Sequence, residues 1–160
     1  GGLILEKSVE LKIGVISDTH GLLRSIVLEK LTGADMILHA GDVGSADIPA
    51  KLREIAPLYI VRGNNDSSYS GLPQREMIET AGGAIYLLHN LQELDILPQA
   101  CGVGVVVSGH THRFACWTRE GVLYANPGAC GPRRFGLPLT MAWLEYRHGR
   151  WTFLPVELEP

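Results

Sequence analysis

The sequence lacks any extended run of basic residues, and its longest is the pair Arg133–Arg134. Its 14 lysines and arginines are outnumbered by 17 aspartates and glutamates, which gives a formal net charge of −3. Proteins that bind nucleic acid broadly present a basic surface to the phosphate backbone. We therefore expect no broad nucleic-acid surface, although a small anionic substrate is not excluded.

Long apolar runs are also missing, and the N-terminal stretch GGLILEKSVE carries no charged leader. A membrane-spanning helix needs about 20 consecutive apolar residues, and a secretory signal combines a charged region with an apolar one. The three cysteines, Cys101, Cys116 and Cys130, are odd in number and lack metal-type spacing, which indicates small apolar fillers in a reducing compartment. We expect a cytoplasmic protein without a membrane segment.

The length of 160 residues suits one domain with a sizeable core and is short for two. The 19 glycines and 9 prolines favour many tight turns over a helical bundle. We expect residues 1–10 to form an N-terminal extension, in which Gly1 and Gly2 are consistent with a remnant of an expression tag. Residues 11–157 are expected to form a single domain.

The first half of the chain alternates apolar segments with helical patterns. This alternation is typical of β-α-β units and predicts a largely parallel sheet. The expected strands are 11–17, 36–39 and 58–62, and the expected helices are 22–32, ended by Gly33, and 47–56, capped by Asp47.

The second half has the turn signals of hairpins instead. We expect it to be largely antiparallel, so that the whole chain is an α/β domain. The expected pairs are 75–80 with 84–89, 114–119 with 122–125 and 138–147 with 151–157, together with a helical piece over 91–100 and a buried strand over 103–107.

Residues with metal-binding side chains follow five of these strands. Within the stretch SGHTH, residues 108–112, the two histidines are two positions apart, so in an extended segment they point to the same side. Taken singly, each such residue is more often an exposed loop residue. Four of the six histidines belong to this set, however, and the carboxyl ends of parallel strands share one edge of a sheet. The set is Asp18, His20, Asp42, Asn64, His89, His110 and His112.

Seven nitrogen and oxygen donors exceed the needs of one tetrahedral zinc and suit two cations that share a bridging carboxylate. Two divalent ions about 3.5–4 Å apart lower the pKa of bound water and stabilise an in-line displacement at phosphorus. The set therefore predicts hydrolysis of a phosphate ester. A single structural zinc is an alternative, which would show one tightly held ion and metal-dependent folding.

These motifs resemble the calcineurin-like metallophosphoesterase superfamily, in order and spacing, over residues 11 to about 157. The tail from Asn126-Pro127-Gly128 to Arg133-Arg134-Phe135 is similar to its small YfcE-type phosphodiesterase branch. The motifs are Asp18-Thr19-His20, Gly41-Asp42, Gly63-Asn64-Asn65-Asp66, His89 and Gly109-His110-Thr111-His112.

The resemblance implies a four-layer αββα sandwich of two mixed β-sheets. It also implies two divalent ions with Asp42 as the bridge between them, and a bridging hydroxide as the nucleophile. One ion would be bound by Asp18, His20, Asp42 and His112, and the other by Asp42, Asn64, His89 and His110.

The chain departs from the family at two positions. Asn65 stands where many larger relatives have a histidine that protonates the leaving group, and a neutral amide cannot deliver a proton. We therefore expect a preference for diesters or for good leaving groups. Asn90 follows His89 where many relatives have glycine, which affects no ligand.

Several other polar and aromatic residues have simpler expectations. Arg113 is a candidate phosphate contact, with a surface role equally open. His39 is expected to pack against the site, Asp66 to orient the Asn64 loop, the turn at 126–128 to brace the metal loop, and Trp117, Trp143 and Trp151 to pack. Arg133, Arg134 and His148 are expected to be solvated.

The sequence thus predicts a metal-dependent phosphoesterase, most simply a phosphodiesterase, with Asp42, Asn64 and Asn65 as catalytic residues. Asn64 and Arg113 would contact the substrate. Manganese is the first choice of metal, with nickel, cobalt, iron and zinc as alternatives. A metal-binding, non-catalytic interaction scaffold, resembling the retromer subunit of the same family, is the alternative function. The natural substrate and a homo-oligomeric state stay open.

Overall fold

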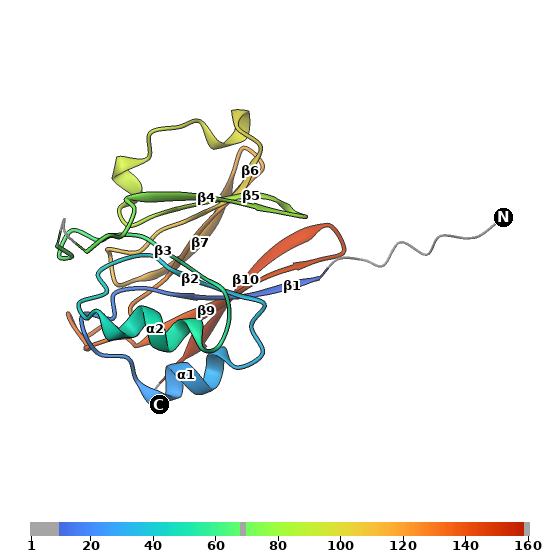
Figure 1. Ribbon diagram of the computed structural model, residues 1–160. Coiled ribbons are helices and arrows are strands. Elements are labelled where there is room, and N and C mark those ends of the chain that lie inside the picture. The colour runs from blue at the N-terminus through green and yellow to red at the C-terminus, as the bar shows by residue number, and fades with distance from the viewer. Residues whose placement is uncertain (1–9, 68–69, 159–160) are drawn as a thin grey trace.

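The computed structural model describes residues 10–67 and 70–158, so that residues 1–9 of the expected extension lie outside the described part. Within this part, ten strands form two mixed sheets of five strands each. Figure 1 shows the two sheets stacked face to face, with α-helices below the lower sheet and short turns above the upper one.

The first sheet has the strand order β10-β9-β1-β2-β3. Its central strand β1 (Leu11–Ile16) pairs in parallel with β2 (Met36–His39), which pairs in parallel with β3 (Leu58–Ile60). On the other side, β1 pairs antiparallel with β9 (Thr140–Arg147), which is followed by β10 (Arg150–Glu157). The predicted parallel unit is therefore present and is extended by the C-terminal hairpin.

The second sheet has the order β4-β5-β6-β8-β7. The predicted hairpins are confirmed as β4 (Arg75–Thr80) with β5 (Gly83–Leu88), and β7 (Phe114–Arg119) with β8 (Val122–Pro127). Strand β6 (Val103–Val107), however, pairs in parallel with both β5 and β8.

The prediction of a largely antiparallel second half is therefore wrong for the centre of this sheet. Neighbouring parallel strands need a long crossover connection. The segment between β5 and β6 supplies one, because it crosses the outer face of the sheet before β6 begins.

The main core lies between the sheets. Ile13 and Val15 of β1 and Val105 and Val107 of β6 are fully buried in one cluster there. Residues two apart in a strand share a face, so each strand contributes alternate residues to this core.

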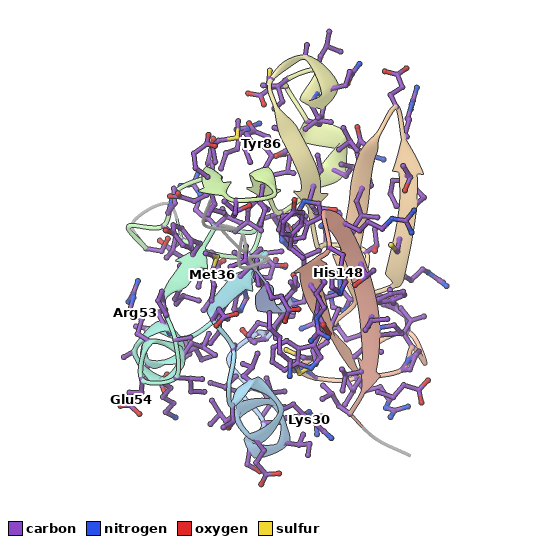
Figure 2. The ribbon with its side chains drawn as sticks, turned by 90° about the vertical axis from the view of Figure 1, so that its right-hand side faces the viewer. Lys30, Met36, Arg53, Glu54, Tyr86 and His148 are labelled. Atoms are coloured by element: carbon purple, nitrogen blue, oxygen red, sulfur yellow. The ribbon has the colours of Figure 1, made fainter. Side chains whose placement is uncertain are left out.

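Two α-helices cover the outer face of the first sheet. Helices α1 (Ser25–Leu31) and α2 (Asp47–Arg53) bury Val27, Leu31 and Leu52 in a second cluster with residues of that sheet. Lys30, Arg53 and Glu54, which Figure 2 labels on or next to these helices, are exposed to solvent. This amphipathic division explains why both segments are helical and why they lie where they do.

The outer face of the second sheet is covered without an α-helix in the described residues. Instead, the 3-10 turns η1 (Leu91–Glu93) and η2 (Pro98–Ala100) replace the helical piece expected over 91–100. Leu91, Leu94 and Ile96 pack there against a cluster that includes Tyr86 and Tyr124. The αββα sandwich is thus confirmed, with one outer layer reduced to turns.

Both helices are shorter than predicted. Before α1, the backbone N–H groups of His20 and Gly21 donate to the carbonyls of Asp42 and Val43, which holds the chain extended beside that loop. At α2, the N-cap is Ala46 and not Asp47. The Asp47 carboxylate instead accepts from the Ser45 hydroxyl and pairs with Lys51, 3.1 Å from Oδ2 to Nζ.

The cysteine and tryptophan predictions hold in part. Only Cys130 is a buried filler, because Cys101 and Cys116 are exposed. Trp143 and Trp151 pack against the cores, whereas Trp117 stacks on Tyr124 and is 42% exposed.

The carboxyl ends of β1, β2 and β3 meet those of β5 and β6 at one end of the sandwich. Among the described helices, none combines the length and the apolar character needed to cross a bilayer.

Candidate metal centre

All seven side chains predicted as metal ligands come together at this end of the sandwich. They lie on the loops that follow β1, β2, β3, β5 and β6, and hydrogen bonds and ion pairs link each of them to at least one other. The two sheets contribute about equally, so the site exists only because the sheets are packed on one another.

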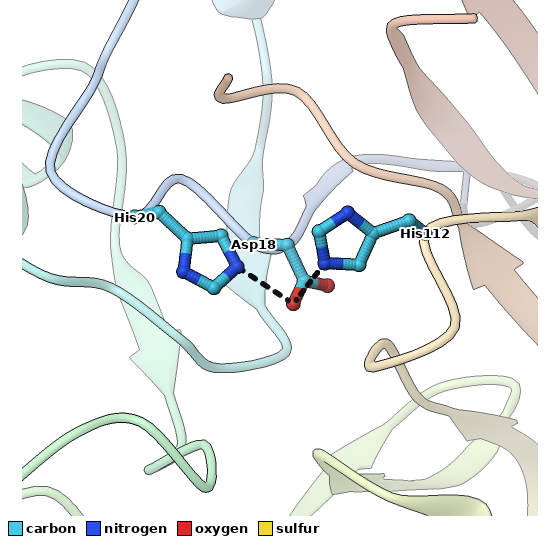
Figure 3. Close-up of side chains that lie close together, drawn as sticks. All are labelled: Asp18, His20 and His112. Carbon is cyan, nitrogen blue, oxygen red and sulfur yellow. Dashed lines mark ion pairs between the residues drawn. The ribbon is translucent and has the colours of Figure 1, made fainter. Parts of the chain in front are cut away.

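One half of the site is centred on Asp18. Its Oδ1 atom lies 3.5 Å from Nε2 of His20 and 3.4 Å from Nε2 of His112, and Figure 3 shows both imidazoles directed at this one oxygen. Among the described residues, Asp18 Oδ1 and His20 Nε2 are buried and have no hydrogen-bond partner. Burying such atoms without a partner is costly, and a divalent cation bound between them would remove that cost. The donor set of this half therefore fits a metal ion.

The other half is centred on Asn64. Its Oδ1 atom lies 2.9 Å from Nε2 of His89 and 3.2 Å from Nδ1 of His110. His89 is buried, whereas Asn64 and His110 are exposed to solvent. An amide oxygen and two imidazole nitrogens that converge in this way also fit a divalent cation.

Asp42 lies between the two halves. Its Oδ2 atom is 3.7 Å from Nε2 of His20 and 3.4 Å from Nε2 of His89. Ligand atoms of Asp18, Asp42 and His89 also lie within 4.8 Å of one another. Asp42 therefore contacts donors of both halves.

Backbone strain is concentrated in these loops. A residue other than glycine pays roughly 1–2 kcal/mol for a left-handed conformation, and such residues gather at functional sites. Five of the seven ligand candidates have a positive φ: Asp18 (57°), His20 (45°), Asp42 (58°), His110 (74°) and His112 (63°).

Two glycines allow the loops to approach closely. A Cβ atom at Gly63 would collide with the carboxylate of Asp42, and one at Gly109 would collide with the hydroxyl of Ser17. The motifs therefore need glycine at these positions, at Gly63 to bring together the loops after β2 and β3, and at Gly109 to bring together the loops of the two sheets.

Hydrogen bonds determine which imidazole nitrogens are available. His89 Nδ1 lies 2.7 Å from the carbonyl of Ala40 and donates to it, which directs Nε2 into the site. A backbone carbonyl that orients a histidine in this way is typical of metal ligands.

His39 packs behind the site, as predicted. Its Nδ1 accepts from Gly41 N–H at 3.0 Å, so Nε2 carries the hydrogen and donates to Thr19 Oγ1 at 3.0 Å. The Thr19 hydroxyl donates in turn to the carbonyl of Val43 at 2.7 Å. Complete burial lowers the pKa of His39 to about 4, so the ring is neutral and holds two ligand loops together.

Both carboxylates are ionised at neutral pH. Burial alone would raise the pKa of Asp18, but the contact with His112 and the hydrogen bond from Ser17 outweigh it and leave the pKa below its ordinary value. The pKa of Asp42 is well below the ordinary value, because contacts with His89 and Asn65 outweigh the effect of burial. Burial lowers the pKa of His89, but the contact with Asp42 outweighs it and leaves the pKa raised.

Two further predicted supports are confirmed. Asp66 accepts backbone N–H groups from Val43 (2.9 Å), Gly44 (3.1 Å) and Gly63 (2.9 Å), which ties the Asp42 loop to the Asn64 loop. Asn126 donates from Nδ2 to the carbonyl of Gly109 at 2.9 Å and so braces the loop of His110.

Of the predicted catalytic and substrate contacts, Asn65 lies at the site and Arg113 beside it. The backbone N–H and the side-chain Nδ2 of Asn65 each donate to the Asp42 carboxylate at 2.9 Å. Arg113 is exposed, and its backbone N–H donates to the hydroxyl oxygen of Thr111 at 3.2 Å.

Three residues at the site were not expected there. Ser17 donates its hydroxyl to Asp18 Oδ2 at 2.7 Å. Arg134 was expected to be only solvated, yet its charge contributes, after burial, to the lowered pKa of His20. The ring of Phe135 lies 5.9 Å, between centroids, from that of His112. Arg134 and Phe135 follow closely after the turn at 126–128, which was expected to brace the metal loop. That turn was the signal in the sequence that could have placed both residues near the site.

Cavities flank the centre on several sides. One of about 610 Å³ is lined by Asn65, Asp66 and the loop that carries Gly44. A smaller one of about 130 Å³ reaches Asn64 and His89 and includes Arg62. A small ligand can therefore approach the donor atoms from solvent.

Comparison with known families gives a match over most of the chain. Residues 11–149 match the model of the calcineurin-like phosphoesterase superfamily domain. A probable metallophosphoesterase of Methanocaldococcus jannaschii is 34% identical over 130 residues, which cover 73% of this chain and 67% of that protein.

Solved structures with the same fold include phosphoesterases and a vacuolar sorting protein. A predicted phosphoesterase from Streptococcus pneumoniae TIGR4 has a TM-score of 0.78 and 25% identity, covering 94% of this chain and 91% of that one. Vacuolar Protein Sorting 29 from Cryptosporidium parvum has a TM-score of 0.75 and 20% identity, covering 92% and 97%. The phosphoesterase YfcE from E. coli has a TM-score of 0.69 and 23% identity, covering 93% and 100%. At 20% and 23% identity, the last two likenesses concern the fold alone.

Proposed function

The chain belongs to the calcineurin-like phosphoesterase superfamily, and from this premise we propose that it is a phosphodiesterase that uses two divalent metal ions. The observation that carries the proposal is the position of Asp42, whose Oδ2 atom lies between His20 of one donor group and His89 of the other. A site for one ion would not need a carboxylate in that place.

The ligands follow from the two donor groups. Asp42 would bridge the ions, which when bound lower the pKa of a shared water and neutralise charge on the phosphate. One ion would be bound by Asp18, His20, Asp42 and His112, and the other by Asp42, Asn64, His89 and His110. Manganese is our first choice among the divalent ions that such mixed donors accept.

The protein's own residues orient the substrate and hold the ligands in place. Asn64 is exposed at the edge of the site, where its amide would donate to a phosphoryl oxygen while its Oδ1 atom would bind the metal. His39 and Asp66 keep the ligand loops in position through bonds to backbone groups. Such a preorganised site stabilises charge that develops in the transition state without having to rearrange.

Asn65 supports a diester over a monoester substrate. Its amide lies against Asp42 and has no proton to give at neutral pH, so it would not protonate a leaving group. Esters whose leaving group departs without protonation are the substrates that this site would hydrolyse best. We place the reaction in the cytoplasm.

A non-catalytic scaffold is the second candidate, because Vacuolar Protein Sorting 29 shares the fold. The complete set of donors with two unpartnered buried atoms favours catalysis, since a scaffold has no need of strained loops aimed at one point. The two candidates differ in what they do to an activated ester.

The test is hydrolysis of bis(p-nitrophenyl) phosphate and p-nitrophenyl phosphate by the metal-free protein with added manganese, nickel, cobalt or zinc. We expect turnover that needs metal and is faster with the diester. Bound metal without a rate above that of the ion alone would contradict the proposal and favour the scaffold. A faster monoester reaction would contradict the diester preference only.

A further inference from the structure

The loop of residues 131–137 holds an exposed aromatic side chain beside the metal centre. Phe135 is 80% exposed, more than any other large apolar side chain in the described part of the chain. Its ring meets the ring of His112 edge to face, with centroids 5.9 Å apart and an angle of 74°. Most of the phenyl surface is therefore free to contact a ligand of the neighbouring site.

This loop is attached to the segment that carries two of the ligands. Cys130 N–H donates to the carbonyl of Ser17 at 3.2 Å, and Arg24 Nε donates to the carbonyl of Gly131 at 3.3 Å. Gly131 packs so closely on the carbonyl of Thr19 that a Cβ atom there would collide with it. The base of the loop is thus held at a fixed position relative to Asp18 and His20.

The tip of the loop is a tight turn that holds the phenyl ring outward. Phe135 has a φ of 57° and Gly136 one of 64°, and Leu137 N–H closes the turn by donating to the carbonyl of Arg134 at 3.0 Å. A phenylalanine in the left-handed region is uncommon, and such conformations gather at ligand sites. The turn therefore keeps an apolar ring in water beside the site.

A positive charge accompanies the ring. Arg134 directly precedes Phe135, whose ring contacts that of His112, and it is exposed, so its charge lies on the same turn as the phenyl ring. A guanidinium suits a phosphate oxygen, whereas an exposed phenyl face suits another planar ring. Together they match a phosphoester that has an aromatic group.

Resting on the phosphoesterase function proposed above, we propose that Phe135 is a substrate-specificity residue that stacks on an aromatic ester group, while Arg134 contacts the phosphate. The aromatic group is the alcohol part of the ester, such as a phenol or a nucleoside whose base reaches the ring. An aliphatic ester of the same charge would gain no contact with Phe135.

A second place for an aromatic group exists and serves as the matched control. A cavity of about 300 Å³ beside His110 is lined by Leu91, Ala115 and Trp117. Trp117 is also an exposed aromatic residue, 42% accessible, and it lies on the outer face of the second sheet. Replacing it separates an effect of the 131–137 loop from a general loss of aromatic surface.

The test is calorimetric binding of phenyl phosphate and methyl phosphate to the manganese-loaded full chain. Both carry the same charge, and neither measurement needs turnover. We expect the unaltered protein to prefer phenyl phosphate by about threefold to tenfold, the range that one aromatic contact supplies. Phe135→Ala should reduce the preference to about one without changing the affinity for methyl phosphate, whereas Phe135→Trp and Trp117→Ala should keep it. Arg134→Ala should lower the affinity for phenyl phosphate and for methyl phosphate by the same factor.

Three results would overturn this inference: no preference in the unaltered protein, a preference that survives Phe135→Ala, or a preference lost in Trp117→Ala. Equal manganese content in all variants excludes an indirect effect through the metal. A protein that prefers phenyl phosphate but hydrolyses no ester would overturn the proposed function and leave the subsite standing.

Discussion

Asp18 and His112, which follow central strands of different sheets, approach each other to 3.4 Å between Oδ1 and Nε2. No local sequence signal can produce this contact, because it depends on how the two sheets are packed. The candidate metal centre therefore depends on the packing of the whole sandwich, and each prediction below changes one part of it.

The first prediction concerns the bridging position. Asp42→Ala removes the carboxylate that lies between the two donor groups, so manganese-stimulated diester cleavage should fall by about a thousandfold or more. This corresponds to the several kcal/mol that metal ions contribute to transition-state stabilisation. The measurement is the initial rate with bis(p-nitrophenyl) phosphate at saturating metal.

Asp47→Ala is the control, since that carboxylate is exposed and pairs with its neighbours Ser45 and Lys51, outside the donor groups. It should keep the full rate. Near-normal turnover in Asp42→Ala would remove Asp42 from the bridging role.

The second prediction concerns the missing proton donor. Asn65→His places an imidazole where the amide now contacts Asp42, so hydrolysis of alkyl monoesters should rise by about tenfold to a hundredfold, below the full range of general acid catalysis. The rate for an activated aryl diester, which needs no proton, should change little. Rates with methyl phosphate and with bis(p-nitrophenyl) phosphate check both statements, and an equal change in the two would contradict the assignment.

The third prediction concerns acid stability. The pKa of His39 is lowered from 6.5 to about 4 by burial, so between these values the unfolded chain binds the extra proton and the folded one does not. The free energy of unfolding should therefore fall as pH decreases from 6.5 to 4, by about 3 kcal/mol from this group.

His39→Gln cannot titrate and should lose this part of the pH dependence, although it is less stable at pH 7. Urea unfolding of the metal-free proteins at several pH values measures the difference. Parallel pH profiles for both proteins would show that His39 titrates normally in the folded state.

The fourth prediction concerns the support of the ligand loops. Asp66→Asn replaces a carboxylate that accepts three backbone N–H groups, which should lower the free energy of unfolding by about 2 kcal/mol and the metal affinity by about tenfold to a hundredfold. Asp35→Asn is the matched control for Asp66→Asn. Asp35 also accepts a backbone N–H, from Lys12 at 2.8 Å, but it does so on an exposed surface. Only the Asp66 variant should lose metal affinity, and an unchanged affinity there would contradict its role.

Much of the site could be predicted from the sequence, because its residues adjoin strands that can be recognised from their local sequence patterns. Val103–Val107 is an uninterrupted apolar segment, and the histidines come directly after it. The pairing of that strand could not be predicted, since a parallel partner is decided by the path of the 89–102 connection across the sheet.

The residues around the ligands were harder to predict. Arg134 and Phe135 lie in a loop rich in proline and glycine, and their place at the site depends on the bonds that Ser17 and Arg24 make with its base. The start of α1 likewise depends on backbone bonds to the Asp42 loop, which a helical pattern in the sequence does not record.

The most direct measurement is the anomalous diffraction of manganese in crystals of the metal-loaded protein. The account predicts two peaks about 3.5–4 Å apart, the usual separation in two-metal sites, with Asp42 in contact with both. One peak should be bound by Asp18, His20 and His112, and the other by Asn64, His89 and His110. A single peak at full occupancy, or two peaks that Asp42 does not join, would contradict it.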